Sequence, residues 1–169
     1  MGLTNLDPPK KVRYIPRKKK TTDEPKMKLN NRTYADWLAL TEEERLLTVQ
    51  IDCVEGRRKD KQCILSLYFP RLFFQLYVLL SDKTQASVQK ALDTLEVYCE
   101  GSVRKVFPVL LGDRGSEFLD HSKIEIGINK NRRTRMFYCD PVKPGQKGAC
   151  EKTMWSSERY CQKVLTLML

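Results

Sequence analysis

The chain has 169 residues, with 31 Lys or Arg against 21 Asp or Glu, so its formal net charge is +10 at pH 7. This length predicts one domain plus a tail, and the excess of positive charge favours a polyanionic partner, either nucleic acid or an anionic membrane. No apolar run approaches the roughly 20 residues that cross a bilayer, and the first residues lack the apolar stretch of a signal peptide. We therefore expect a cytoplasmic protein that does not use a membrane as its partner.

Residues 1–32 are predicted to form a basic lead-in outside the folded core. Prolines at positions 8, 9, 16 and 25 interrupt this segment, and its apolar residues are too scattered to be buried together. One interpretation is a solvated linker. The other, which we favour, is an arm that follows a phosphate backbone. The basic side chains of this arm are Lys10, Lys11, Arg13, Arg17, Lys18, Lys19 and Lys20.

A helix and three strands are predicted after this arm. Residues 33–47 carry an apolar stripe with helical spacing, and Thr41 with Glu44 forms a capping box for a second turn. The strand candidates, rich in aromatic and branched residues, are 47–53, 62–69 and 72–80. Their aromatic residues, which we expect in the core, are Tyr68, Phe69, Phe73, Phe74 and Tyr77.

Residues 81–99 give the clearest helix of the chain. Ser81 can cap it, and apolar residues recur at three- and four-residue spacing up to Tyr98. The later candidates are a strand at 106–111, a short helix or extended loop at 118–128, a strand at 134–139 and a final helix. This order is that of the ribonuclease-H-like fold. We therefore expect an α/β protein with a mixed five-stranded sheet and flanking helices, incomplete at the C-terminus.

Three carboxylates lie where elements of this fold end or begin. Asp52 would end the first strand, Asp113 would end the fourth, and Glu151 would open the last helix. The first and fourth strands of such a sheet are adjacent and parallel, so their terminal acids project from the same edge. Carboxylates gathered in a basic protein suggest divalent metal ions that act on phosphate. With 21 acids in the chain, this spacing alone would often arise by chance.

The six cysteines are expected to be reduced thiols rather than zinc ligands. They form no Cys-x-x-Cys pair, and the single histidine, His121, is too isolated to complete a site or to act as a general base. Four of them lie in apolar stretches, where a thiol packs as a small hydrophobic group: Cys53, Cys63, Cys99 and Cys139.

Six stretches resemble the catalytic core of DDE transposases of the insertion-sequence-30 type, which are relatives of retroviral integrases. Together they span about residues 47–152. They are Ile51-Asp52-Cys53-Val54-Glu55-Gly56, Asp82-Lys83-Thr84-Gln85-Ala86, Phe107-Pro108-Val109-Leu110, Asp113-Arg114-Gly115-Ser116-Glu117-Phe118, Arg133-Thr134-Arg135-Met136-Phe137-Tyr138-Cys139-Asp140-Pro141 and Gln146-Lys147-Gly148-Ala149-Cys150-Glu151-Lys152.

This resemblance implies that Asp52, Asp113 and Glu151 are a catalytic triad that binds two Mg²⁺ or Mn²⁺ ions. It implies nicking of DNA at transposon ends, followed by attack of the freed 3′-hydroxyl on target DNA. It also implies a homo-oligomer when the protein is intact, associated with a bacterial nucleoid. Beyond the basic arm, the core residues expected to contact DNA are Arg57, Arg58, Lys147 and Lys152.

The chain departs from the family in several places. Members carry a helix-turn-helix region ahead of the core, whereas this chain begins in the linker. The usual Trp before Gln-Lys-Gly is replaced by Lys143-Pro144-Gly145, and Cys53 stands where Thr is common. After Lys152 the family continues as Asn-His, several residues of helix and then Val-Leu-Pro-Lys-Gly, which this chain lacks.

We interpret residues 153–169 as out-of-frame sequence that follows the loss of one base near the codon for Lys152. Tyr-Cys-Gln-Lys-Val can be encoded TAC-TGC-CAA-AAG-GT, and moving the frame back by one base gives Leu-Pro-Lys-Gly. Restoring one A in AAA-ACC-ATG likewise turns Lys-Thr-Met into Asn-His, so one shift repairs two segments. The alternative is an ordinary divergent helix in which apolar residues pack, namely Val164, Leu165, Leu167 and Met168.

The predicted organisation is a basic linker with a short helix at 1–45, an integrase-type catalytic core at 46–152 and the out-of-frame tail at 153–169. Glu151 would then lose its supporting helix, and because a metal ligand needs rigid support, we expect catalysis by this chain to be impaired. Two alternatives to an active transposase stay open. One is a non-catalytic DNA-binding remnant, and the other is a ribonuclease-H-like nuclease that cleaves RNA–DNA hybrids without joining DNA ends.

Sequencing the genomic DNA through and beyond the Lys152 codon tests the frameshift interpretation. We expect the shifted frame to continue as Asn-His and then as Leu-Pro-Lys-Gly, because both segments stand in the register of the family. If an independent read contains no such frame, the tail is genuine coding sequence and the interpretation is wrong.

Overall fold

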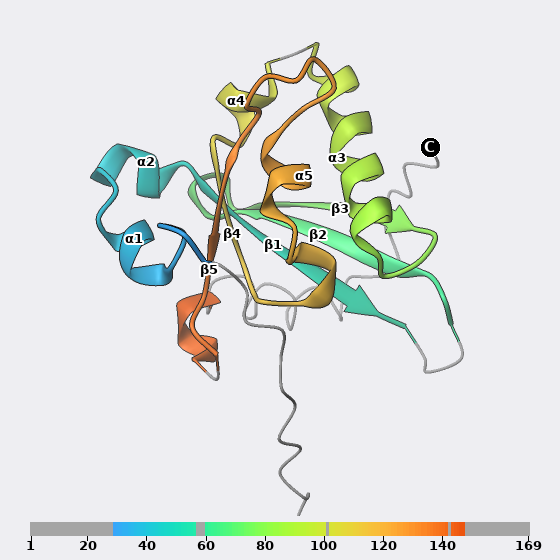
Figure 1. The fold of residues 1–169 in the computed structure, drawn as a ribbon, viewed down its shortest axis with the longest axis horizontal. Coiled ribbons are helices and arrows are strands. Elements are labelled where there is room, and N and C mark those ends of the chain that lie inside the picture. The colour runs from blue at the N-terminus through green and yellow to red at the C-terminus, as the bar shows by residue number, and fades with distance from the viewer. Residues whose placement is uncertain (1–28, 57–59, 101, 142, 148–169) are drawn as a thin grey trace, which may run out of the picture.

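The computed structural model describes residues 29–56, 60–100, 102–141 and 143–147 of the chain (Figure 1). Five strands form one sheet in the spatial order β3-β2-β1-β4-β5. Neighbours among β1, β2 and β3 are antiparallel, whereas β4 runs parallel to β1 and β5 runs parallel to β4. This is the strand order of the ribonuclease-H-like fold, so the expected fold class is confirmed. The strands are β1 (Thr48–Glu55), β2 (Cys63–Phe69), β3 (Phe74–Leu80), β4 (Val109–Gly112) and β5 (Arg135–Tyr138).

The longest described helix, α3 (Gln85–Tyr98), follows the edge strand β3 and leads toward β4, which pairs with β1 at the middle of the sheet. Such a crossover is what allows β4 to run parallel to β1. The shorter helices are α1 (Tyr34–Leu38), α2 (Glu42–Leu46), α4 (Val103–Val106) and α5 (His121–Glu125). The 3₁₀ turns are η1 (Pro70–Leu72), η2 (Ser116–Phe118) and η3 (Pro144–Lys147).

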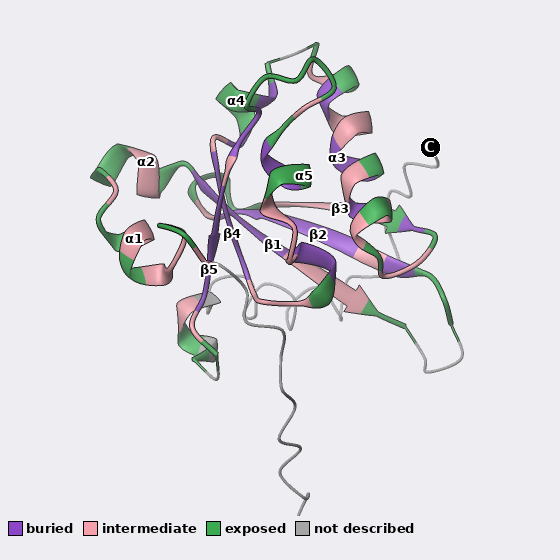
Figure 2. Cartoon of the chain, viewed as in Figure 1, coloured by how far each residue is buried: buried purple, intermediate pink, exposed green. Residues whose placement is uncertain are grey.

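The sheet separates two apolar layers, because successive side chains of a strand point to opposite faces. We call them the α3 layer and the α1 layer. In the α3 layer, Ile51 of β1 and Leu110 of β4 pack with Leu92 of α3. Figure 2 shows the buried residues following the central strands. The α1 layer contains Val109, Leu111, Phe137 and Cys139, packed against Tyr34, Trp37 and Leu40.

The segment ahead of β1 is docked onto the sheet rather than detached from it. Nε1 of Trp37 donates a hydrogen bond to Oγ1 of Thr48 at 2.9 Å. The carbonyl of Arg32 accepts a hydrogen bond from the Tyr138 amide at the end of β5, also at 2.9 Å. Residues 29–46 therefore contribute to the same folded unit as the strands, and the prediction that the lead-in outside the core extends to residue 32 is wrong for residues 29–32.

Two predicted helices differ in their limits from the observed ones. The helix expected over 33–47 is two short helices, since Thr33 and Thr41 each form a capping box and the second box starts a new helix. The helix expected from Ser81 begins at Gln85, because Thr84 is its N-cap and accepts the Ser87 amide. Ser81 was the predicted cap, but Thr84 has the extended backbone geometry of an N-cap residue.

The strand expected at 106–111 also begins later. Residues 103–106 form α4, and β4 starts at Val109, directly after Pro108. Proline disfavours helix in the residue before it, so α4 stops before Phe107. The region expected as a short helix or extended loop at 118–128 contains α5.

The prediction that the aromatic residues of the first strands lie in the core is only partly correct. Tyr68 and Phe69 are buried, whereas Phe73 is 87% exposed and Phe74 is 51% exposed. Phe73 follows η1 with a φ of 49°, in the left-handed region, and this turn directs the chain into β3. On α3, Tyr98 is likewise 64% exposed and lies outside the buried stripe.

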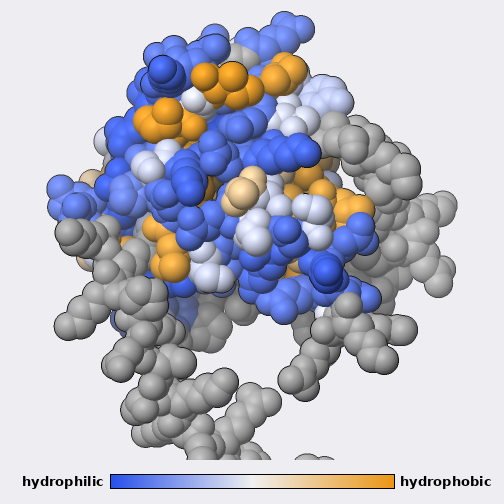
Figure 3. All heavy atoms as spheres, turned by 45° about the vertical axis from the view of Figure 1, so that its right-hand side comes forward, coloured by the Kyte–Doolittle hydropathy of each residue, from blue (hydrophilic) through white to orange (hydrophobic). Residues whose placement is uncertain are grey.

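The thiols of Cys53, Cys63, Cys99 and Cys139 are free, as expected. Among the described helices, none has the length and apolar character that crossing a membrane requires. The side of the molecule seen in Figure 3 is mostly hydrophilic, with its apolar side chains in separate patches.

Arg133 joins α3 to α5 from within the core. Its side chain is 1% exposed and pairs through Nη1 with Asp93 (2.5 Å) and Glu96 (3.3 Å) of α3. Nε and Nη2 donate to the backbone carbonyls of Ile124 and Lys123, each at 2.8 Å. A buried guanidinium is stable only when its donors are paired in this way.

We expect Arg133→Met to lower the free energy of unfolding by about 3–5 kcal/mol, because it leaves the buried carboxylate of Glu96 and the half-buried carboxylate of Asp93 without this basic partner. Urea unfolding followed by circular dichroism measures the change. Arg104→Met is the matched control, since Arg104 is exposed on α4. Equal free energies of unfolding for the two variants would show that the Arg133 ion pairs contribute nothing.

Candidate active site at the ends of β1 and β4

Asp52 and Asp113 lie at the same level on adjacent strands. β1 and β4 pair with Thr48 opposite Val109 and Gln50 opposite Leu111. The same register, continued by two residues, places Asp52 opposite Asp113, which directly follows β4. Both residues are half-buried. Because neighbouring strands lie about 4.8 Å apart, two such carboxylates can bind a common cation.

Both carboxylates belong to the sheet face of the α1 layer. Along β1, Ile51 packs in the α3 layer, so its neighbour Asp52 has the opposite orientation. Along β4, Leu111 packs in the α1 layer, and the alternation continued to Asp113 gives the same face. The bulk of α3 therefore lies behind the site.

A nearby backbone amide orients each carboxylate. Oδ1 of Asp52 accepts a hydrogen bond from the Cys53 amide, and Oδ1 of Asp113 accepts one from the Gly115 amide, both at 3.0 Å. The second bond closes a tight turn directly after β4, of the kind that Asp commonly forms with the backbone two residues on. Fixed orientation of this kind is what a metal ligand needs.

The third predicted carboxylate, Glu151, lies outside the described residues. Within the described part of the chain, no group of three or more His, Cys, Asp or Glu side chains could hold a metal ion. Asp52 and Asp113 nevertheless fit Mg²⁺, which binds through one or two carboxylates and completes its shell with water and phosphate oxygens. The structure thus brings together two of the three predicted ligands.

Most of the predicted DNA-binding residues also lie outside the described residues. For Lys147 the structure describes only the backbone, which belongs to η3. The others, outside the described ranges, are Lys10, Lys11, Arg13, Arg17, Lys18, Lys19, Lys20, Arg57, Arg58 and Lys152.

An ion-pair cluster that sequence reasoning missed joins the two segments that carry the aspartates. Nζ of Lys83, in the turn before α3, lies 2.5 Å from Oε1 of Glu55 at the end of β1 and 3.4 Å from Oε1 of Glu117 in η2. The hydrogen bond between Lys83 and Glu55 lowers the pKa of Glu55 and raises that of Lys83. We call these residues the Glu55–Lys83–Glu117 cluster. All three lie inside the stretches that resemble the transposase family. No other feature of the sequence indicated that they would form a cluster.

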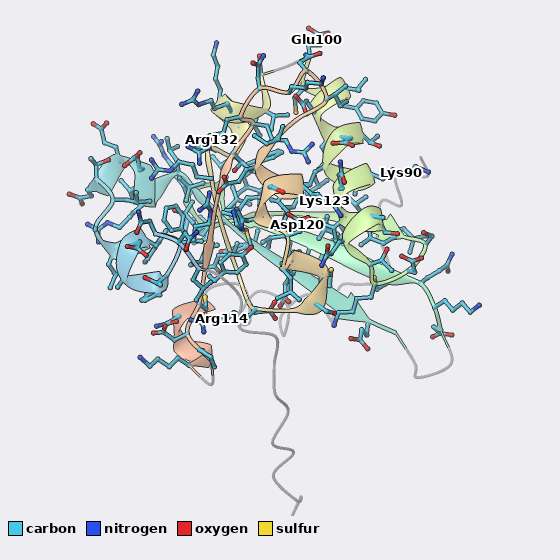
Figure 4. The ribbon with its side chains drawn as sticks, viewed as in Figure 1. Lys90, Glu100, Arg114, Asp120, Lys123 and Arg132 are labelled. Carbon is cyan, nitrogen blue, oxygen red and sulfur yellow. The ribbon has the colours of Figure 1, made fainter. Side chains whose placement is uncertain are left out.

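Arg114 and Asp140 form a second contact at this edge of the sheet. Nη2 of Arg114 lies 3.6 Å from Oδ1 of Asp140, and Nε of Arg114 is buried with no hydrogen-bond partner among the described residues. Gln146 of η3 accepts the Asp140 amide at 2.7 Å and donates to its carboxylate at 3.1 Å. Figure 4 shows Arg114 beside η3, at the lower end of the strands. These contacts tie the end of β4 to the last described element.

Comparisons with known proteins give a likeness of fold. No protein-family model matches the chain, and no curated protein matches it. Solved structures give 90 matching chains. One is the crystal structure of the catalytic core domain of BIV integrase, with 16% sequence identity, a TM-score of 0.46 and coverage of 69% of this chain and 74% of that chain.

Gly112 lets β4 lie close to its neighbours immediately before Asp113. A Cβ atom there would lie 2.6 Å from Cε of Met136 and 3.0 Å from Cγ2 of Ile51. We expect Gly112→Ala to lower the free energy of unfolding by about 1–3 kcal/mol, since added volume in a packed core displaces its neighbours. Chemical unfolding measures this. The control is Gly145→Ala, because a Cβ at Gly145 meets nothing within 4 Å; equal effects of the two substitutions would contradict the close approach.

Proposed function

We propose that this chain is the catalytic core of a DNA transposase of the insertion-sequence-30 type, in which Asp52, Asp113 and Glu151 hold two Mg²⁺ or Mn²⁺ ions. The observation that carries the proposal is the level placement of Asp52 and Asp113 on adjacent parallel strands. The sequence stretches that resemble the family support it, because they put these three residues at the triad positions.

In this proposal the residues of the chain bind the metal ions and hold the metal ligands in orientation. Asp52 and Asp113 supply hard carboxylate oxygens at the sheet edge, and the Cys53 and Gly115 amides keep those oxygens in place. Divalent ions bound there would neutralise phosphate charge and activate the attacking oxygen. The remaining task of the protein is to hold the DNA backbone against this edge.

The basic residues of the chain would hold the DNA. Its net charge of +10 favours binding to phosphate, in a manner that weakens as salt rises. We propose residues 1–45 as the basic linker with a short helix, of which residues 29–45 pack on the core, and residues 46–152 as the catalytic core, followed by the out-of-frame tail. Residues 29–46 dock onto the sheet through Trp37 and Arg32, which would fix the base of the arm relative to the site.

We expect Asp52→Asn and Asp113→Asn to abolish Mg²⁺- or Mn²⁺-dependent nicking and joining of DNA, because each removes a charged ligand. Salt-sensitive DNA binding should persist in both variants, since it depends on the basic residues. Nicking of supercoiled plasmid and joining of labelled ends measure the reaction, and a filter-binding titration at two salt concentrations measures affinity. Glu42→Gln, an acid-to-amide change at an exposed position of α2, is the matched control.

Three results would contradict the transposase proposal, each in a different way. DNA binding by the unchanged chain without any metal-dependent nicking would indicate a non-catalytic remnant. Cleavage of RNA–DNA hybrids without joining of DNA ends would indicate a ribonuclease-H-like nuclease. Nicking that survives both aspartate substitutions would show that the site lies elsewhere.

A further inference from the structure

We infer that Lys83 is a positioning residue, which sets the spacing of Asp52 and Asp113 by joining Glu55 and Glu117 behind the sheet. The inference rests on the proposed function, because it concerns the same pair of carboxylates. It assigns to Lys83 no contact with DNA or metal.

The need for such a residue follows from where the strand pairing stops. The pairing of β1 with β4 ends at Gln50 and Leu111, so both aspartates lie beyond the last paired residues. Past that point β1 stays paired with β2 up to Glu55, whereas β4 ends at Gly112 and the chain turns after Asp113. Two carboxylates that share a cation must keep their spacing within about 0.5 Å, so a link between the two segments beyond their shared pairing has a direct effect on the site.

The Glu55–Lys83–Glu117 cluster supplies this link. Glu55 lies at the end of the strand that carries Asp52, and Glu117 follows the turn that begins at Asp113. Lys83 contacts both, at 2.5 and 3.4 Å. Among the described residues, Lys83 is the only cation that pairs with Glu117.

Glu117 transmits this link to Asp113 through the turn. Its side chain is 2% exposed, and a Cβ atom at Gly115 would lie 2.6 Å from its Oε2, so the carboxylate rests against the backbone of Gly115. The amide of Gly115 is the donor that holds Oδ1 of Asp113. Movement of Glu117 would therefore move the amide that orients Asp113.

The lysine itself has a rigid base. Its neighbour Asp82 accepts hydrogen bonds from the hydroxyls of Thr84 (2.6 Å) and Ser87 (2.5 Å), and Thr84 caps α3. The helix in turn is packed into the α3 layer. Lys83 thus links both segments to α3, which packs in the α3 layer on the sheet face opposite to the site.

The test compares Lys83→Met with Lys83→Arg and with Lys90→Met, a matched control on the exposed side of α3 (Figure 4). The dissociation constant for Mn²⁺ is measured by electron paramagnetic resonance at a temperature where each variant is folded. We expect Lys83→Met to weaken Mn²⁺ binding by about 10-fold or more, Lys83→Arg to restore most of it, and Lys90→Met to have no effect. If Lys83 only adds stability, Lys83→Met will lower the melting temperature and leave the Mn²⁺ dissociation constant unchanged. That result would overturn the inference.

A second measurement separates this inference from the proposed function. Hydrogen exchange of the peptides that cover residues 52–55 and 113–118 needs no metal, and we expect it to become faster in Lys83→Met while exchange within α3 stays the same. If the unchanged chain binds no Mn²⁺, the proposed function is wrong, and exchange alone decides the role of Lys83. Unchanged exchange in both peptides would overturn the inference. If Lys83→Met does not fold because the buried carboxylate of Glu117 is left unpaired, the double variant Lys83→Met with Glu117→Gln removes both charges of this pair and is tested in the same way.

Discussion

The parallel pairing of β1 with β4 is the interaction on which the rest of the structure depends. It brings together two segments that are separated in the chain by β2, β3 and α3. Its register decides which residues of the two strands stand at the same level, and it places Asp52 level with Asp113. A slip of one residue would turn Asp113 to the opposite face of the sheet. The same pairing also places the small Gly112 where Ile51 and Met136 leave no room for a side chain.

Buried ion pairs hold the elements that surround this pairing. Glu96, Glu117 and Glu125 are all buried, and each pairs with a basic residue. Glu125 accepts hydrogen bonds from Arg32 and from the Met136 amide, so it joins the segment ahead of β1 to α5 and β5. Burial alone would raise the pKa of Glu125, but these hydrogen bonds outweigh burial and lower its pKa. The ion pairs of these buried carboxylates therefore connect separate helices and strands of the protein.

Much of the fold could be predicted from hydrophobic patterning, because the strands are short apolar runs bounded by turn residues. Asp52 and Asp113 could be found because each follows such a run. The start of α3 could not, since Ser81 and Thr84 are both suitable caps and only the backbone geometry selects Thr84. The link through Lys83 could not be foreseen either, because its partners are distant in the chain and pair only after the sheet has formed. Glu151 and the basic arm lie outside the described residues and stay predictions.

The topology of the sheet has a consequence for how the site comes into being. The antiparallel strands β1, β2 and β3 are neighbours in sequence, so they can pair after closing only short loops. The pairing of β1 with β4 must wait until α3 has carried the chain back across the sheet, and contacts between distant segments form slowly. The topology therefore allows the meander to form before the pairing of β1 with β4 brings the two carboxylates together. An incompletely folded molecule would present Asp52 without Asp113, so the proposed metal site would be absent until β1 and β4 pair.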